Sequence, residues 1–168
     1  MLGGVLVSIN SWPSNMDRYE LVPELKAWDA HNGGEESPEG WASCMGNFSL
    51  AVAYASLIWP CFVEVHGMVF REGVTEQDVA SWLASAAHDK KVVEATINHL
   101  HILDVQHPGI WSDATETQLR FLGESLRSSW ANKLALDFPT RQFVVEFIYG
   151  SADNLREYQV LFYERREG

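Results

Sequence analysis

Cysteine is scarce in this chain, and so are the marks of a secreted or membrane-spanning protein. The 168 residues include only Cys44 and Cys61, too few for a disulfide framework. Met1–Gly4 has neither the basic start nor the long apolar run of a signal peptide. Ala51–Ile58, the most apolar stretch, is far too short to cross a bilayer. We therefore expect a cytoplasmic protein, away from membranes, with both thiols reduced.

Positive charge is also in short supply. The chain has 12 Lys and Arg against 23 Asp and Glu, which gives a net charge of −11. Nucleic acids and anionic membrane surfaces attract clustered Lys and Arg, so this balance argues against direct binding to either. It permits a basic protein partner, although excess charge also serves simply to keep a protein in solution.

Several familiar catalytic and binding signatures are missing. The sequence has no G-x-x-x-x-G-K-[ST] or G-x-G-x-x-G segment for a nucleotide and no G-x-S-x-G nucleophile turn. It also lacks C-x-x-C and H-E-x-x-H, two patterns typical of redox and metal sites. No cofactor is expected on this basis. Enzymes that use other motifs stay open as an alternative.

Apolar material, by contrast, is sufficient for a core, because 46% of the residues are hydrophobic. The length suits one domain, which we expect to cover residues 1–168. Met16–Ala30 has helical character, but Pro23 must interrupt it or open a second helix. Asn47–Ser49 can cap a helix over Leu50–Trp59 that is apolar nearly all round, and such a helix is expected in the middle of a domain.

Three further helix starts follow. Thr75–Asp78 resembles a capping box, with Asp in the place of Glu, and an apolar stripe runs from Val79 to Ala86. Asp89 can cap the next helix. Asp113–Glu116 has the cap-x-x-Glu form, and a third helix with an apolar face over Leu119–Trp130 is expected after it.

Strand patterns lie at both ends and in the middle of the chain. Gly4–Ile9 is short and β-branched, and Phe62–Arg71 contains a Gly that indicates a bulge or a turn between two strands. Gln142–Tyr149 and Arg156–Arg165 should form an antiparallel C-terminal hairpin. Both of its faces are apolar, so it is either central in a sheet or meets a partner. These elements predict an α+β fold, a mainly antiparallel sheet with about four to five helices packed on it.

An acidic loop is the first candidate site. Glu35, Glu36 and Glu39 lie in it, and Trp28 and Trp41 flank it. The first 40 residues carry 7 acidic and 2 basic side chains. Acidic charge that steers a basic partner, with aromatic anchors beside it, is typical of a protein interface. The same residues would also suit a solvated, mobile loop.

His66 is the second candidate. Alternate residues of a strand share a face, so Glu64 could orient the His66 imidazole as an acid–base group. Cys44 or Cys61 could supply a nucleophile, although nothing in the sequence brings either close to His66. The alternative is an exposed cross-strand pair without a chemical role.

A histidine cluster is the third candidate. His99, His101 and His107, with Asp104 between them, are ligand types for zinc or iron. The stretch 96–103 has the pattern of a helix end, and on a helix residues two apart point about 200° away from each other. His99 and His101 could share a metal only if the stretch were extended. The alternative is a set of polar residues at a helix terminus.

Together these features favour a non-enzymatic binding protein. An inhibitor, an immunity-type antidote or an adaptor would hold a basic protein on its acidic, aromatic surface. A small enzyme that depends on His66 or on a metal is the second hypothesis. The third is a homo-oligomer that pairs through the C-terminal hairpin.

Overall fold

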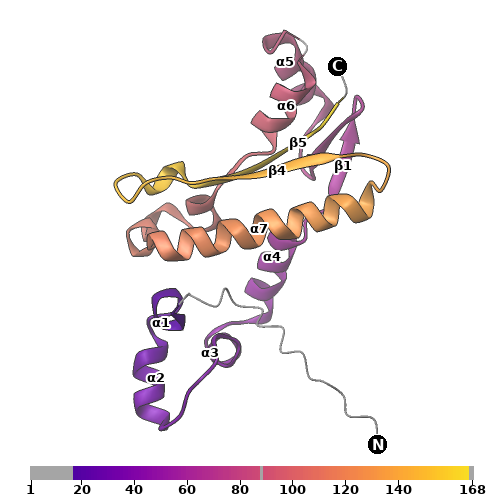
Figure 1. The fold of residues 1–168 in the computed structure, drawn as a ribbon. Coiled ribbons are helices and arrows are strands. Elements are labelled where there is room, and N and C mark those ends of the chain that lie inside the picture. The colour runs from indigo at the N-terminus through magenta and orange to yellow at the C-terminus, as the bar shows by residue number, and fades with distance from the viewer. Residues whose placement is uncertain (1–16, 88, 167–168) are drawn as a thin grey trace, which may run out of the picture. The chain divides into compact units, whose positions relative to one another are not determined.

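The computed structural model describes residues 17–87 and 89–166 of the chain (Figure 1). The strand expected at Gly4–Ile9 lies outside these residues. The chain divides into two compact units, Met1–Met45 and Gly46–Gly168. Within the described residues no helix has both the length and the apolar character that spanning a membrane requires.

The described part of the first unit is helical. It contains α1 (Arg18–Leu21), α2 (Leu25–Asn32) and α3 (Pro38–Met45). Pro23 lies between α1 and α2, so the interruption expected there is confirmed. Gly33 ends α2 with a φ of 68°, a left-handed conformation that glycine adopts without strain. The acidic loop expected around Glu35, Glu36 and Glu39 is shorter than its sequence indicated, because α2 ends at Asn32 and α3 begins at Pro38, which places Glu39 in a helix.

The second unit is an α+β structure with antiparallel pairing, as the sequence predicted, although its strands form two sheets where one was expected. Strands β1 (Phe62–Val65) and β2 (Met68–Arg71) form one sheet. The other has the order β3-β5-β4, and its members are β3 (Leu100–His101), β4 (Phe143–Ile148) and β5 (Gln159–Glu164). The C-terminal hairpin of β4 and β5 is therefore confirmed. Strand β5 is central in this sheet, and β4 lies at its edge.

Four α-helices are described in this unit, and local capping residues explain where all four start. Asn47 caps the first of them, as expected, by accepting a hydrogen bond from the N–H of Leu50. Thr75 and Asp78 form the expected capping box, and Asp89 accepts hydrogen bonds from two N–H groups of the helix that it opens. The last helix starts two residues later than predicted. Asp113 closes a 3₁₀ helix instead, and Thr115 forms a capping box with Gln118. The helices are α4 (Phe48–Ile58), α5 (Glu76–Ser85), α6 (Lys90–Ile97) and α7 (Glu116–Asp137), and the 3₁₀ helices are η1 (Ile102–Val105), η2 (Pro108–Asp113) and η3 (Leu155–Glu157).

The apolar core of this unit has two parts. Helix α7 runs along one face of the β4–β5 hairpin, and α5 and α6 lie on the other side (Figure 1). The larger part fills the space between α7 and the hairpin, where Trp130 and Phe162 are fully buried and contact edge to face. The smaller part joins β2 to α5 and α6, and its buried members are Met68, Phe70, Val79 and Val93.

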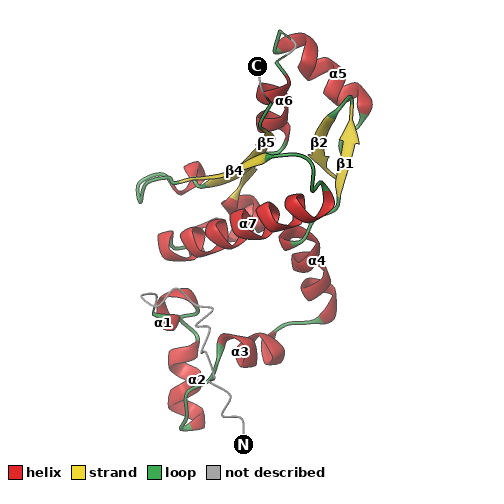
Figure 2. Cartoon of the chain, turned by 45° about the vertical axis from the view of Figure 1, so that its right-hand side comes forward, coloured by secondary structure: helices red, strands yellow, loops and turns green. Residues whose placement is uncertain are grey.

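Helix α4 is where the fold departs most from expectation. It was expected in the middle of the domain, but none of its residues is buried. It leaves α7 on the side opposite the hairpin (Figure 2). The prediction is wrong because α7 is long enough to cover the hairpin alone, so α4 meets the core only through partly buried Leu57.

Candidate interaction surfaces and the other predicted sites

The acidic loop of the first unit is held by a polar network that the sequence did not reveal. Asp29 of α2 accepts a hydrogen bond from the backbone N–H of Glu36 at 2.7 Å and one from the Tyr19 hydroxyl, also at 2.7 Å. Arg18 pairs with the same carboxylate at 2.5 Å and donates to the carbonyl oxygen of Glu36 at 2.6 Å. The loop is therefore tied to α1 and α2 at Glu36.

These bonds also set the charge state of the network. The Glu36 N–H and the Tyr19 hydroxyl both favour the ionised carboxylate and hold the pKa of Asp29 below its ordinary value. Arg18 is one of only two basic residues between positions 17 and 45, and its charge is taken up by Asp29. The other acidic residues of positions 17–45 therefore have little positive charge near them in the sequence.

The five predicted binding residues are all in this unit, with different exposure. Glu35 and Glu39 are exposed, while Glu36 is partly buried through its place in the network. Trp28 and Trp41 are both half-buried, and the Trp41 indole N–H is buried without a hydrogen-bond partner among the described residues. Glu35 and Glu39 thus present acidic charge to solvent, while the indoles of Trp28 in α2 and Trp41 in α3 expose only part of their surface.

Helix α4 forms a second exposed surface, in the other unit. Its exposed large side chains include Phe48 at 93% and Val52 at 69%, and Trp59 just after it is 47% exposed. Patches of this kind on a folded protein mark sites of interaction. A signal in the sequence could have found it, because no charged residue occurs between Glu39 and Glu64.

His66 and Glu64 are not brought together. Strand β1 ends at Val65, and His66 lies in the two-residue turn before β2 with a φ of 53°. The two residues therefore do not share a strand face as expected. Glu64 instead forms an ion pair with Arg141 at 2.9 Å.

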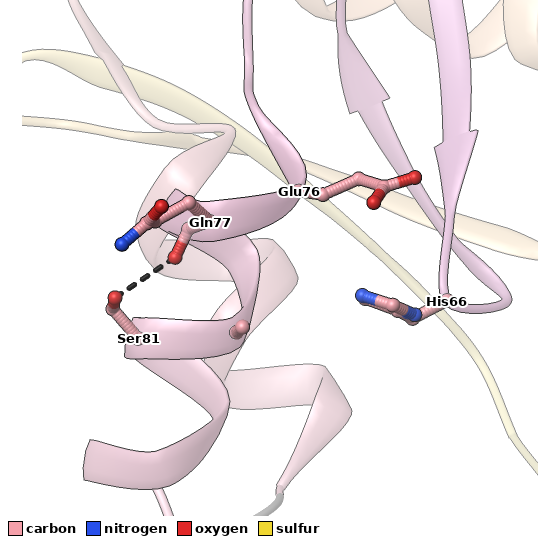
Figure 3. Close-up of a pocket in the computed structure, with 5 residues that line it drawn as sticks. His66, Glu76, Gln77 and Ser81 are labelled. Carbon is pink, nitrogen blue, oxygen red and sulfur yellow. Dashed lines mark hydrogen bonds between the residues drawn. The ribbon is translucent and has the colours of Figure 1, made fainter.

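The surroundings of His66 are open. It is exposed and lines a shallow hollow of about 630 Å³ together with residues of α5. Figure 3 shows Glu76 and His66 on facing sides of this hollow, and the hydrogen bond drawn there joins Ser81 to the carbonyl oxygen of Gln77. An imidazole in so open a position has little protection from water.

The histidine cluster is only partly assembled. Helix α6 ends at Ile97, inside the stretch where a helix end was expected, but Leu100–His101 is a strand, so placing His99 and His101 on a helix is wrong. The rings of His99 and His101 lie 5.2 Å apart, centre to centre. His99 Nδ1 is hydrogen-bonded to the carbonyl oxygen of Thr96, and His101 Nδ1 to that of Arg156.

The remaining members of that cluster have local roles. His107 Nδ1 accepts a hydrogen bond from the N–H of Gly109 and caps η2, and Asp104 is exposed in η1. Over the described ranges, no three His, Cys, Asp or Glu side chains are arranged so that they could hold a metal ion. Cys44 and Cys61 are free and exposed.

A charged network at the junction of the two sheets was not predicted. Arg141 bonds to Glu64, to Glu164 and to the carbonyl oxygen of Gly67. Arg166 bonds to buried Glu94 and lies 2.7 Å from Glu164. These contacts join β1, the β1–β2 turn, α6 and β5. We therefore assign this network a structural role in holding these elements together.

Comparison of this chain with protein-family models, with curated proteins and with solved structures found no match.

Proposed function

We propose that this chain is a non-enzymatic protein-binding protein, of the inhibitor, immunity-type antidote or adaptor kind, whose first unit binds a basic protein. One observation carries the proposal. Residues 17–45 contain 7 acidic and 2 basic side chains, and the loop with Glu35 and Glu36, which leads to Glu39 in the first turn of α3, is tied to α1 and α2 at Glu36 by Asp29 and Arg18.

The network matters because it fixes the charge in place. A mobile acidic loop would lose conformational entropy when it binds, whereas a loop held by hydrogen bonds has lost most of it on folding. Fixed acidic charge accelerates encounter with a basic surface and contributes to its selection. The half-buried Trp28 and Trp41 supply apolar contact area in the same unit.

The test compares two variants with the same change in net charge. Glu35→Gln/Glu36→Gln/Glu39→Gln removes three acids from the first unit. Glu72→Gln/Asp104→Asn/Asp153→Asn removes three exposed acids from the second unit. Proteins retained from a host extract at low salt by the tagged wild-type chain are identified, and the strongest candidate is purified for binding measurements.

We expect the first variant to bind that protein at least about tenfold more weakly, mostly through slower association, and the second variant to bind it as the wild type does. The affinity of the wild type should fall as salt rises, because salt screens exposed charge. Equal binding by both variants, or an affinity that salt leaves unchanged, would contradict the proposal.

A further inference from the structure

His99 and His101 lie on the same side of an extended segment. Leu100–His101 is strand β3, which pairs with β5, and alternate residues of an extended chain share a face. The two imidazole rings are 5.2 Å apart, centre to centre. An extended backbone is the condition under which these two histidines can share a metal ion, and the structure meets it.

Hydrogen bonds fix which nitrogen of each ring can bind a metal ion. His99 Nδ1 bonds to the carbonyl oxygen of Thr96, and His101 Nδ1 to that of Arg156 at 2.7 Å. A carbonyl oxygen only accepts, so both Nδ1 atoms carry a proton, and in the neutral rings the lone pair is on Nε2. Neither Nε2 atom has a hydrogen-bond partner in the part of the chain that the structure describes. Metal-binding histidines usually donate their other ring N–H to a carbonyl or carboxylate oxygen in this way.

His107 differs from this pair in the position of its ring proton. Its Nδ1 accepts a hydrogen bond from the N–H of Gly109 at 3.1 Å, so in the neutral ring the proton is on Nε2. Neither nitrogen of this ring then offers a free lone pair. Asp104 does not complete a larger set, because the described ranges hold no group of three His, Cys, Asp or Glu side chains suited to a metal ion. The structure therefore selects two of the four predicted ligands.

We propose that His99 and His101 together bind one divalent transition-metal ion through their Nε2 atoms. An ion bound to Nε2 lies about 3.2 Å from the ring centre, so two rings on one ion at a tetrahedral angle have centres about 5 Å apart. The separation of these two rings meets that requirement. Imidazole suits Zn(II), Cu(II) and Ni(II), whereas Mg(II) and Ca(II) prefer oxygen ligands.

Two protein ligands leave the other coordination positions of the ion open. A structural zinc site has four protein ligands, and a catalytic zinc site has three. The histidine pair therefore holds its ion less tightly than either and exchanges it with solution, and water fills the remaining positions. The site does not depend on the acidic loop of the proposed function, which belongs to the other unit.

The first part of the test concerns the ring protons of the metal-free chain. Nitrogen-15 NMR of the full chain distinguishes Nδ1–H from Nε2–H imidazoles at about pH 8.5, where ordinary imidazoles are neutral. We expect the proton on Nδ1 in His99 and His101 and on Nε2 in His107. A proton on Nε2 of either His99 or His101 would overturn the proposal.

The second part adds zinc chloride to the full chain. Cys44 and Cys61 are free and exposed and would compete for zinc, so every chain in this part carries Cys44→Ser and Cys61→Ser. Zinc should shift the Nε2 signals of His99 and His101 together, along one binding curve, and magnesium chloride should shift neither. A zinc shift at only one of the two rings, or at neither, would contradict the proposal.

Three matched variants complete the test. The asparagine amide can keep the hydrogen bond that each Nδ1 makes now, as donor or as acceptor, but it has no ring nitrogen for the metal. His99→Asn should weaken zinc binding at His101 at least about tenfold, and His101→Asn should do the same at His99. His107→Asn is the control and should leave zinc binding at the pair unchanged. Equal zinc affinity in all three variants would overturn the proposal.

Discussion

Glu94 and Arg166 form a two-pronged ion pair that joins α6 to the residues after β5. Arg166 Nη1 lies 2.7 Å from Glu94 Oε2, and Nη2 lies 2.8 Å from Oε1. The buried Glu94 carboxylate also accepts hydrogen bonds from the backbone N–H groups of Val69 at 2.9 Å and Glu164 at 3.0 Å. Since Val69 is in β2 and Glu164 in β5, a single carboxylate links the two sheets.

Glu94→Gln should lower the free energy of unfolding by about 3 kcal/mol, because the buried pair loses one charge and an amide NH₂ group faces backbone donors. Urea unfolding followed by circular dichroism measures the change. Glu146→Gln is the control, because Glu146 is exposed and accepts a hydrogen bond from the Tyr163 hydroxyl. It should cost less than about 1 kcal/mol.

The coupling between the two partners can be measured separately. Glu94→Gln and Arg166→Gln should destabilise the protein by less in combination than the sum of their single effects, because each removes the same interaction. Fully additive effects would show that the ion pair contributes nothing to stability.

Gly123→Ala should destabilise the protein even though alanine is the better helix former by about 1 kcal/mol. A Cβ atom at this position of α7 would overlap the ring of Phe147, which is buried in β4. We expect a net loss of about 1–3 kcal/mol in the free energy of unfolding. Gly34→Ala, which adds its Cβ in open space, should have little effect. A stabilised Gly123→Ala variant would contradict the close approach of α7 and β4.

The order of the acidic loop should depend on pH through Asp29. The fold lowers the pKa of this carboxyl group below the value of about 3.9 that it has in an unfolded chain. Its contribution to stability is therefore complete above that value and is lost as pH falls through the folded-state pKa. The protection of the Glu36 amide, which donates to Asp29, against hydrogen exchange should fall in acid when the measured rate is divided by the intrinsic rate at the same pH. In Asp29→Asn the amide should exchange faster at neutral pH and lose this dependence, and an unchanged profile would contradict the prediction.

His66→Asn should leave the fold intact, because the position has a φ of 53° and precedes Gly67 with a φ of 73°. Asn-Gly is a favoured pair in a two-residue hairpin turn with positive φ at both positions. The free energy of unfolding should therefore rise by about 0.5 kcal/mol or less. Thermal unfolding measures it. A marked loss of stability would mean that the imidazole has a structural role. A folded variant offers a clean test of the alternative in which this residue is catalytic.

Local features of the sequence were reliable guides to the secondary structure. Pro23 separates two helices, and Thr75 and Asp89 begin helices because their side chains bond to backbone groups two or three residues away. The alternation of Gln142–Tyr149 and Arg156–Arg165 identified the hairpin, because neighbouring strands need only a short connection to pair. Interactions of this kind are contained within a few residues.

The candidate sites were less predictable, because they depend on contacts between distant parts of the chain. Glu64 faces Arg141, 77 positions away, and so is not available to His66. The hydrogen bond from Arg18 to the carbonyl oxygen of Glu36 depends on the packing of α1 against α2. No pattern in the sequence of the acidic loop indicates this bond.

The sequence by itself determined the net charge, the caps, the turns and the hairpin, and with them an α+β fold. Only the tertiary structure decided which apolar helix covers the sheet. Leu50–Trp59 and Leu119–Trp130 both carry enough apolar residues for a core, but the face of a hairpin has room for one long helix, and α7 occupies it. Burial of either helix would be favourable because both are apolar, but a close-packed core has room for only one of them against the hairpin. That competition leaves α4 in solvent.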